Sequence, residues 1–304
     1  EDRESRAYIS LGQGSRRVNY AKVYAGFYES GRNRVPFLMV VKVGAPNEAL
    51  STARAPGNRG KRDSMVIVLS FLERCMNLVH NRITPLDFEL FNLCYNLLGI
   101  DPREFKYMLV TDADTQVQDD VVFRMVSRLE ADPKILAING HIRPANPEEN
   151  IVTMLQIFPL YMTFYSGLAY EACLGRVTTI NGGFVMYRIW TELPGNLPAA
   201  GDTSLIGGFA APRPDTMHME NVLLLGEEQY FGIVLLRSNP QYRFAFEPEA
   251  IAYATLPTNF FALQALQIRN LRVTFNTQVE FQHVAKHLGL MYWLISFTKL
   301  LDMI

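Results

Sequence analysis

The chain is poor in cysteine and has almost no excess of charge of either sign. Cys75, Cys94 and Cys173 are the three cysteines among 304 residues. They lack metal-ligand spacing, and an odd number cannot all pair. We therefore expect reduced, buried thiols in a cytosol-facing protein. The formal net charge of -1 at pH 7 argues against a general polyanion binder of the nucleic-acid type.

The sequence also lacks a signal peptide. It opens on the charged stretch Glu1–Glu4 with no apolar core behind it. The apolar stretch Leu288–Ile304 carries Lys299 and Asp302 and is shorter than the roughly 18–20 apolar residues of a membrane span. A buried helix, an interfacial helix and the start of a membrane segment all remain open for it. We expect both ends to be cuts rather than natural termini.

What the chain does contain is enough apolar sequence for a sizeable core, with 49% hydrophobic and 19% charged residues. Strands and helices alternate, which predicts an α/β fold with a mostly parallel sheet. A loop is expected at 194–214. The predicted strands are Phe37–Val43, after a polar leader, Tyr107–Val110, Ile135–Gly140 and Val177–Arg188. The predicted helices are Ser64–Val79, Pro85–Leu98, Asp119–Glu130, Ile151–Leu174, Glu227–Leu236 and Phe260–Asn276.

Two aspartates follow the apolar strand Tyr107–Val110. Asp112 and Asp114 are separated by one alanine, and ligands of open α/β sheets bind beyond the carboxyl ends of strands. We expect this strand to be central in the sheet. Two carboxylates at its end suit a hard divalent ion that bridges to a substrate phosphate. The alternative is a turn-forming pair, because Asp is common after strands.

A basic cluster precedes the first predicted helix. Lys61 and Arg62 lie just before Asp63 and Ser64, either of which would serve as the N-cap. Cations beside a helix start make an anion site, and solvated loop charge is the competing interpretation.

A second pair of acids opens a later helix. Glu227 and Glu228 suit the helix dipole for structural reasons alone. A carboxylate there can equally act as a general base if a hydroxyl lies within hydrogen-bond reach. The Gly182-Gly183 break marks a place where backbone approaches a ligand closely. The aromatic stripe of the long helix is expected to be core, and consists of Phe158, Tyr161, Phe164, Tyr165 and Leu168.

In this order, the motifs resemble those of fungal-type chitin synthases, membrane-embedded processive glycosyltransferases of family 2 with the GT-A fold. The likeness runs from about Ala21 to Glu280. Its clearest pieces are Ala21–Tyr28, Pro56–Ser64, Asp112–Thr115 and Phe184–Arg188.

On the donor side, the resemblance implies a site for a uridine diphosphate sugar. Lys61, Arg62 and Asp63 would hold the uridine diphosphate. Asp112 and Asp114 would place the diphosphate with a Mn²⁺ or Mg²⁺ ion. The two groups are therefore expected to converge on one cleft.

On the acceptor side, Glu228 with its neighbour Glu227 falls where the family has its general base. The segment Leu266–Asn270 falls on the family motif Gln-Arg-Arg-Arg-Trp, whose arginines face the diphosphate. Arg269 matches in one register, and Gln267 matches when the register slips by one.

The resemblance further implies a mixed, mainly parallel GT-A-like sheet flanked by helices and followed by interfacial or amphipathic helices. Residues 1–280 would be the catalytic domain, lacking the first strand, and 281–304 an interfacial helix or the start of a membrane segment. The reaction would be inverting transfer of N-acetylglucosamine from UDP-N-acetylglucosamine to a growing β-1,4 chitin chain. The full protein would lie in the plasma membrane with this portion facing the cytosol, with homo-oligomerisation left open.

The sequence departs from the family mainly on the acceptor side. Glu228 replaces an aspartate, Gln229 replaces an arginine, and Asn270 stands in place of the stacking tryptophan. Further departures are His141, Pro159-Leu160, Asn181 and Gly183. Three functions stay open: an active synthase with a divergent acceptor site, a silent paralogue that binds a nucleotide sugar or a partner chitin synthase, and a transferase for another sugar.

Overall fold

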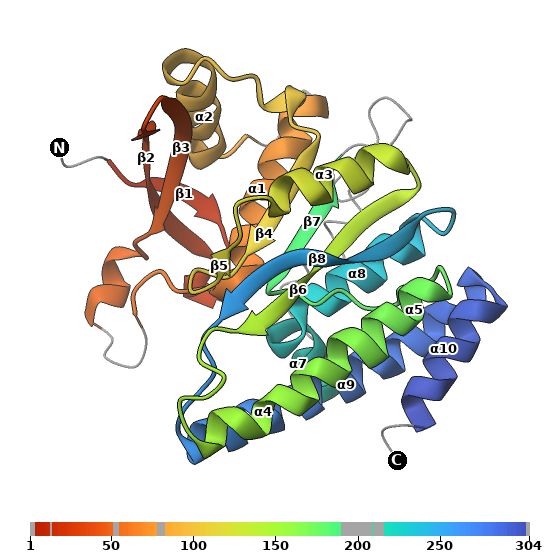
Figure 1. Ribbon diagram of the computed structural model, residues 1–304. Helices are drawn as coiled ribbons and strands as arrows, with labels where there is room; N and C mark the ends of the chain where they lie inside the picture. The colour runs from red at the N-terminus through yellow and green to blue at the C-terminus, as the bar shows by residue number, and fades with distance from the viewer. Residues whose placement is uncertain are drawn as a thin grey trace. The chain divides into compact units, whose positions relative to one another are not determined.

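The computed structural model describes residues 4–12, 14–50, 55–77, 83–189, 209 and 216–301, which belong to two compact units (Figure 1). Unit 1 comprises Glu1–Phe105 and Ala200–Arg213, and unit 2 comprises Lys106–Ala199 and Pro214–Ile304. Most of the loop expected at 194–214 lies outside the described residues.

Unit 1 contains an antiparallel sheet in the order β1 (Arg6–Ile9), β2 (Val18–Ser30), β3 (Asn33–Lys42). The expected polar leader is therefore wrong, because it contains two strands. Alternate residues of β2, namely Asn19, Ala21 and Val23, are buried, which is the period of a strand with one covered face. Gly31, at φ 60°, permits the tight turn into β3.

The helices of unit 1 are α1 (Gly60–Asn77) and α2 (Pro85–Asn92), which continues into the π-helical turn η3 (Leu93–Leu97). Short 3-10 turns lie at η1 (Gly14–Arg16), η2 (Pro46–Leu50) and η4 (Pro102–Glu104). Helix α1 begins four residues earlier than expected, so the basic cluster forms its first turn and neither Asp63 nor Ser64 is the N-cap. Helix α2 is capped by a reciprocal pair of hydrogen bonds between Thr84 and Asp87.

The cysteine expectation is confirmed for two thiols. Cys75 and Cys94 are buried in unit 1, and burial raises their pKa values to about 12 and about 11. Cys173 in unit 2 is exposed, so the expectation of burial is wrong there. This residue ends the long helix, beyond the part of it that packs inward.

Unit 2 is built on a five-stranded mixed sheet in the order β4-β7-β6-β8-β5. The strands are β4 (Tyr107–Thr111), β7 (Phe184–Arg188), β6 (Ile135–Pro144), β8 (Arg243–Ala254) and β5 (Gln116–Val117). Strands β4, β6 and β8 run in one direction and β7 and β5 in the other. The mixed α/β class is thus confirmed. The sheet is mixed rather than mainly parallel, because β6–β8 is the one parallel pair among the neighbouring strands of the described sheet.

Two details of the expected sheet need correction. Strand β4 ends the order of the described sheet rather than lying at its centre, because β7 inserts antiparallel between β4 and β6. The strand expected at Val177–Arg188 begins only at Phe184. The preceding segment, 177–183, contributes a single bridge from Val177 to Phe244 and otherwise forms a loop.

Helices cover both faces of this sheet. Helix α3 (Val121–Ala131) buries Val121, Met125 and Leu129 against residues of β6, β7 and β8. On the opposite face, Tyr187 of β7 meets Phe231 of α8 (Glu227–Ser238), with ring centroids 5.5 Å apart. The alternation of side chains along β7 places its residues in both layers.

A layer of longer helices completes unit 2. Helices α4 (Ile151–Tyr161) and α5 (Ala169–Cys173) are joined without a break by the π-helical segment η5 (Met162–Leu168). Helix α9 (Phe260–Leu288) contacts α7 (Met217–Leu225), α8 and α10 (Leu290–Leu301). Figure 1 shows α4 and α5 running beside α9 and α10.

The expected aromatic core stripe of the long helix is mostly wrong. Phe164 and Leu168 are buried, whereas Phe158 and Tyr161 are 68% and 55% exposed. Pro159 lies inside this helix and removes one backbone donor, and the π-helical turn follows directly. An insertion of this kind rotates the later residues relative to the earlier ones, so a regular helical period misassigns the inward face.

Candidate functional site

The site in unit 2 is organised around the loop 177–183. Asn139 of β6 is fully buried and holds this loop by its side-chain amide. Its oxygen accepts a hydrogen bond from the backbone N–H of Asn181 at 2.7 Å, and its nitrogen donates to the carbonyl of Thr179 at 3.1 Å. A buried amide satisfied in this way fixes the backbone that it bonds.

Two predicted site residues meet at the end of this loop. The backbone N–H of Asp112 donates to the carbonyl of Gly183 at 3.1 Å. A Cβ placed on Gly183 would lie 3.2 Å from Asp112 Oδ2, and one placed on Gly182 would lie 1.5 Å from Glu228 Oε2 and 2.4 Å from Glu228 Cβ. The close approach expected at this glycine pair is therefore made by the protein's own carboxylates.

Glu228 lies in the first turn of α8, beside Glu227, where the helix dipole favours negative charge. Burial, together with the Glu228 carboxylate, raises the pKa of Tyr187. The next residue, Gln229, accepts a hydrogen bond from Thr277 Oγ1 of α9 at 2.6 Å. The start of α8 is thus tied to the helix that carries the expected acceptor-side residues.

Asp112 is half-buried and Asp114 is exposed in the turn after β4. Among the described residues, no group of three or more His, Cys, Asp or Glu side chains could hold a metal ion. Asp112 and Asp114 supply two carboxylates. Such a pair fits Mg²⁺ or Mn²⁺, because these ions commonly bind one or two carboxylates and complete their coordination with water and substrate phosphates.

A pocket of about 600 Å³ opens in unit 2 between the long helix and α9. Gln267 and Asn270 of α9 line it, as do Gly183 and Gln229 from the turn that seats the carboxylates. Arg269 is exposed and lies outside the lining. Of the acceptor-side residues that the resemblance implies, Gln267 and Asn270 therefore line the pocket and Arg269 does not.

A buried ion pair at the wall of this pocket escaped the sequence analysis. Glu171 of α5 and Lys299 of α10 form a close ion pair in which the Glu171 side chain is 2% exposed. Glu171 also accepts hydrogen bonds from the N–H and the hydroxyl of Thr178 at 2.7 and 2.9 Å. One signal was available, because Lys299 interrupts an apolar stretch, but sequence could not give its partner.

His141, where the family resemblance led us to expect glutamate, is packed inside unit 2. Its ring lies 5.1 Å from Phe164 and 5.0 Å from Tyr165, measured between centroids. Its Nδ1 lies 3.3 Å from the carbonyl oxygen of Pro248. Burial lowers the pKa of His141, so the neutral imidazole suits this place.

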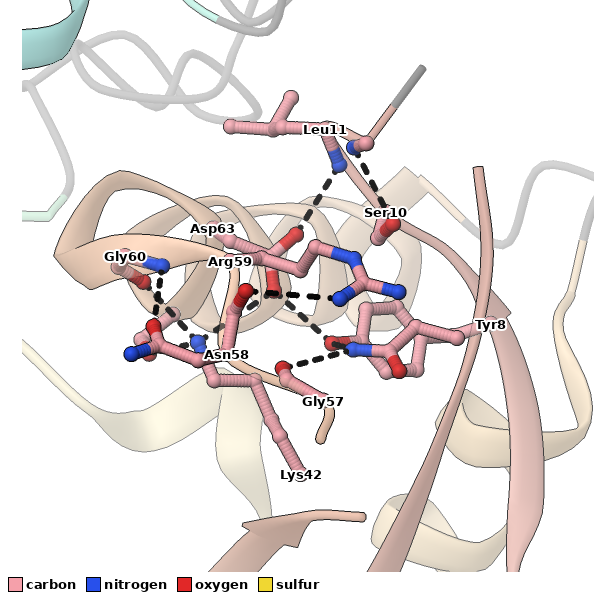
Figure 2. A network of polar contacts seen from close by, with 12 residues as sticks. Tyr8, Ser10, Leu11, Lys42, Gly57, Asn58, Arg59, Gly60 and Asp63 are labelled. Atoms are coloured by element: carbon pink, nitrogen blue, oxygen red, sulfur yellow. Dashed lines mark hydrogen bonds and ion pairs between the residues drawn. The ribbon is translucent and has the colours of Figure 1, made fainter. Parts of the chain in front are cut away.

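In unit 1, the side chain of Asp63 is the centre of a polar network (Figure 2). Its carboxylate accepts hydrogen bonds from the Tyr8 hydroxyl at 2.8 Å and the Leu11 N–H at 3.1 Å, and Lys42 Nζ lies 3.4 Å away. Asp63 and Arg62 are buried, whereas Lys61 is half-buried. Asp63 therefore anchors the N-terminal strand to the first turn of α1.

In the described part of the segment before α1, Gly44 and Glu48 contact Gly57 and Arg59. Gly44 and Gly57 both have positive φ, and a Cβ on either would lie 2.5 Å from the backbone nitrogen of the other. Glu48 accepts hydrogen bonds from Arg59 and from the N–H of Gly57. These bonds, with Arg59 contributing most, lower the pKa of Glu48 to about 2. Because Lys61–Asp63 lie in unit 1 and Asp112 and Asp114 in unit 2, their convergence stays a prediction.

A mixed sheet flanked by helices, with an acid beyond β4 and an acid at the start of α8 on one glycine turn, is the arrangement of a GT-A-like glycosyltransferase domain. The comparison with known families agrees. A sequence model described as "Chitin synthase" matches residues 1–304, and the chain belongs to the chitin synthase family.

Curated relatives give the same result. The chain is 34% identical to Chitin synthase C of Emericella nidulans over 100% of the chain and 26% of that protein. It is 34% identical to Chitin synthase 4 of Cryptococcus neoformans var. grubii over 98% of the chain and 23% of that protein. It is 35% identical to Chitin synthase 4 of Neurospora crassa over 92% of the chain and 23% of that protein. The chain thus spans about a quarter of the length of these relatives.

Proposed function

We propose that this chain is the catalytic portion of a chitin synthase. It transfers N-acetylglucosamine from UDP-N-acetylglucosamine to the end of a β-1,4-linked chain with inversion. The observation that carries the proposal is the meeting of Asp112 and Glu228 on the Gly182–Gly183 turn, next to a pocket lined by Gly183 and Gln229. Donor-side and acceptor-side carboxylates therefore share one rigid piece of backbone.

On the donor side, Asp112 and Asp114 would hold a Mn²⁺ or Mg²⁺ ion, which when bound would offset the charge of the leaving diphosphate. Lys61 and Arg62, in the first turn of α1, act on the same anion with the backbone donors of that turn. Asp63 positions that turn, because its carboxylate is already engaged by Tyr8 and Leu11.

On the acceptor side, the terminal sugar of the growing β-1,4-linked polysaccharide occupies the pocket of about 600 Å³. This volume is within the roughly 300–1,000 Å³ of small-molecule sites. Glu228 takes the proton of the acceptor hydroxyl, whose oxygen bonds to the anomeric carbon as the bond to the diphosphate breaks. A general base must come within about 2.6–3.2 Å of that oxygen. Glu227 lies beside Glu228 in the first turn of α8, Gln267 hydrogen-bonds in the pocket, and Arg269 contributes positive charge on α9 from outside the pocket lining.

The full protein lies in the plasma membrane with this portion facing the cytosol. Helix α10 supports this placement, because it buries Tyr292 and Ile295 while exposing Leu290, Leu294 and Phe297, as an interfacial helix does. Among the described helices, Ile151–Cys173 is long and apolar enough to cross a membrane, and 22% of its apolar window is buried. Length and composition alone are weak evidence for a span.

A second candidate function, a silent paralogue that binds the donor or a partner chitin synthase, rests on the pocket lining. Asn270 lies where the resemblance implies a tryptophan, and Phe164 is the aromatic residue in the lining. Asparagine offers no face on which a sugar ring can stack. Acceptor binding would then be weak while donor binding persists.

One experiment separates these functions from each other and from a transferase for another sugar. The full-length protein in membranes is supplied with UDP-N-acetylglucosamine and Mn²⁺ or Mg²⁺, and β-1,4-linked product is measured beside donor binding. Product supports the synthase. Donor binding without product supports the silent paralogue. Transfer from a different nucleotide sugar supports the third function, and absence of both binding and transfer contradicts the proposal.

A further inference from the structure

The Glu171–Lys299 ion pair joins the last helix to the loop 177–183. Besides its ion pair with Glu171, the Lys299 ammonium donates to the hydroxyls of Thr178 at 2.7 Å and Thr179 at 3.1 Å. Helices α5 and α10 therefore both hold Thr178, through Glu171 and Lys299, and α10 also holds Thr179.

Thr178 and Thr179 lie a few residues before the glycine pair that contacts the carboxylates of Glu228 and Asp112, and the residues between them are held in place. Ile180, directly after Thr179, is fully buried, and its side chain lies 2.9 Å from the place where a Cβ of Gly232 in α8 would stand. Asn181 is held by Asn139 at 2.7 Å, and Gly182 lies under Glu228. Ile180 and Asn181, which link the threonines to the glycine pair, are both held by neighbouring residues. A shift of Thr179 therefore moves Gly182, against which Glu228 lies.

We propose that Lys299 and Glu171 are a positioning pair for the transfer reaction, which rests on the proposed function. They hold Thr178 and Thr179 so that the Gly182–Gly183 turn presents Glu228 and Asp112 correctly. Neither side chain touches the reacting atoms. The packing of helix α10 against the rest of unit 2 therefore affects the rate of the transfer step, in which Glu228 takes the proton of the acceptor hydroxyl.

The competing explanation is a purely structural ion pair. Burying two charges is costly, and a buried pair often contributes little net stability, whereas removal of one partner alone destabilises strongly. Lys299→Met alone is therefore a poor test, because Glu171 would be left buried and charged. The double variant Glu171→Gln with Lys299→Met removes both charges together and keeps similar side-chain volumes.

The control is a second ion pair of similar burial. The side chains of Arg74 and Asp87 are 31% and 8% exposed, against 26% and 2% for Lys299 and Glu171. Arg74→Met with Asp87→Asn removes that pair without touching the loop 177–183. Lys299→Arg is the conservative variant, because it keeps the charge.

The measurements are made on full-length protein in membranes: the turnover number, the KM for UDP-N-acetylglucosamine, the thermal midpoint, and the hydrogen exchange of peptides covering 177–184. We expect Glu171→Gln/Lys299→Met to lower turnover by about tenfold or more, since small misplacements of a base are costly. The donor KM should stay within about twofold, and exchange of the loop should accelerate. Lys299→Arg should keep most of the turnover of the unmodified protein. The control variant Arg74→Met/Asp87→Asn should lower only the thermal midpoint.

Unchanged turnover and unchanged exchange in the folded double variant would overturn the proposal. So would an equal loss of turnover in the control pair. If the unmodified protein transfers no sugar, the proposed function fails by itself. Hydrogen exchange then decides the structural half of the inference: faster exchange in the double variant supports the grip on the loop, and unchanged exchange refutes it.

Discussion

Replacing Gly182 by alanine should disable the site although the backbone at residue 182 itself suits alanine. Gly182 is not among the glycines with positive φ, so alanine can adopt its conformation. Where a residue fits its backbone, Gly→Ala stabilises a protein by about 0.4–1 kcal/mol through the unfolded state. A loss of activity would therefore come from the new methyl group meeting Glu228.

The size of the displacement follows from the geometry. The new Cβ would lie 1.5 Å from Glu228 Oε2, 1.9 Å from its Cδ and 2.4 Å from its Cβ, whereas ordinary contact begins at 3.4 Å. Rotation about the side-chain bonds can move the carboxylate but not the Cβ. The first turn of α8 must then withdraw by about 1 Å, and misplacement of a catalytic group by about 1 Å costs on the order of a hundredfold in rate.

The assay is sugar transfer by the full-length protein in membranes, with donor binding and the thermal midpoint measured on the same preparations. Gly182→Ala should lower transfer by about a hundredfold and leave donor binding near that of the unmodified protein. Gly183→Ala is the graded comparison. Its Cβ would meet Ile142 Cδ1 at 2.9 Å and Asp112 Oδ2 at 3.2 Å, ends of side chains that can yield, so the loss should be smaller.

A double variant tests whether the effect passes through Glu228. In a Glu228→Ala background the methyl group at residue 182 still meets the Cβ of residue 228, but no carboxylate remains to be misplaced, and effects of residues that act as a unit do not add. Gly182→Ala should therefore cause little further loss there. Full transfer activity in Gly182→Ala, or an undiminished loss in the Glu228→Ala background, would refute the reasoning.

Three further predictions concern the metal, the acceptor side and pH. Asp114→Ala should abolish metal-dependent donor binding, measured by calorimetry with and without Mn²⁺, and unchanged affinity would contradict the assignment. Glu228→Asp combined with Asn270→Trp should raise transfer more than either change alone, because base and acceptor platform serve one transition state; no gain from the pair would count against this. Burial lowers the pKa of His141 from 6.5, so the unfolded chain binds its proton first and stability should fall as the pH drops below about 6.5. Thermal unfolding at pH 5 and pH 7.5 should show a smaller acid loss in His141→Phe, and equal losses in both proteins would contradict this explanation.

The sequence predicted element types best where hydrophobic periodicity was strong. Helix α3 and strand β6 lie where they were expected, because each buries an uninterrupted inward face. The order in which the strands pair in the sheet was harder to predict from the sequence. Strand β4 is apolar like a central strand, yet it ends the order of the described sheet, since periodicity reports burial and not the identity of the neighbouring strand.

The early strands were missed for a different reason. Strand β2 has Tyr20 and Lys22 between its buried residues Asn19, Ala21 and Val23, and such a polar alternation is easily taken for a leader. For the long helix, the predicted buried face was wrong because the sequence period is irregular. Its π-helical segment and Pro159 break the regular period, and the inward face cannot be assigned from spacing alone.

For the site, the sequence identified the residues that carry charge at the ends of elements, and the fold supplied what holds them. Asp112 and Glu228 were found because an acid beyond a strand or at a helix start has a recognisable chemistry. Asn139, Glu171 and Lys299 were not assigned, because each acquires its role from a partner distant in the chain. Their contacts arise from tertiary packing, which no local pattern contains.

The exchange of aspartate for glutamate at residue 228 can be reconsidered in this light. Glutamate is longer by one methylene, and extended straight it would move the carboxylate forward. Here the side chain lies along Gly182, with one carboxylate oxygen buried, and Glu228 is not among the residues that line the pocket. The extra length is accommodated by folding over a residue that has no side chain. For Glu228 to act as the base, the carboxylate must turn toward Gly183 and Gln229, which do line the pocket, and the glycine leaves it room to do so. The glutamate at 228 therefore depends on glycine at 182, both for the space its side chain occupies now and for the room it needs to turn.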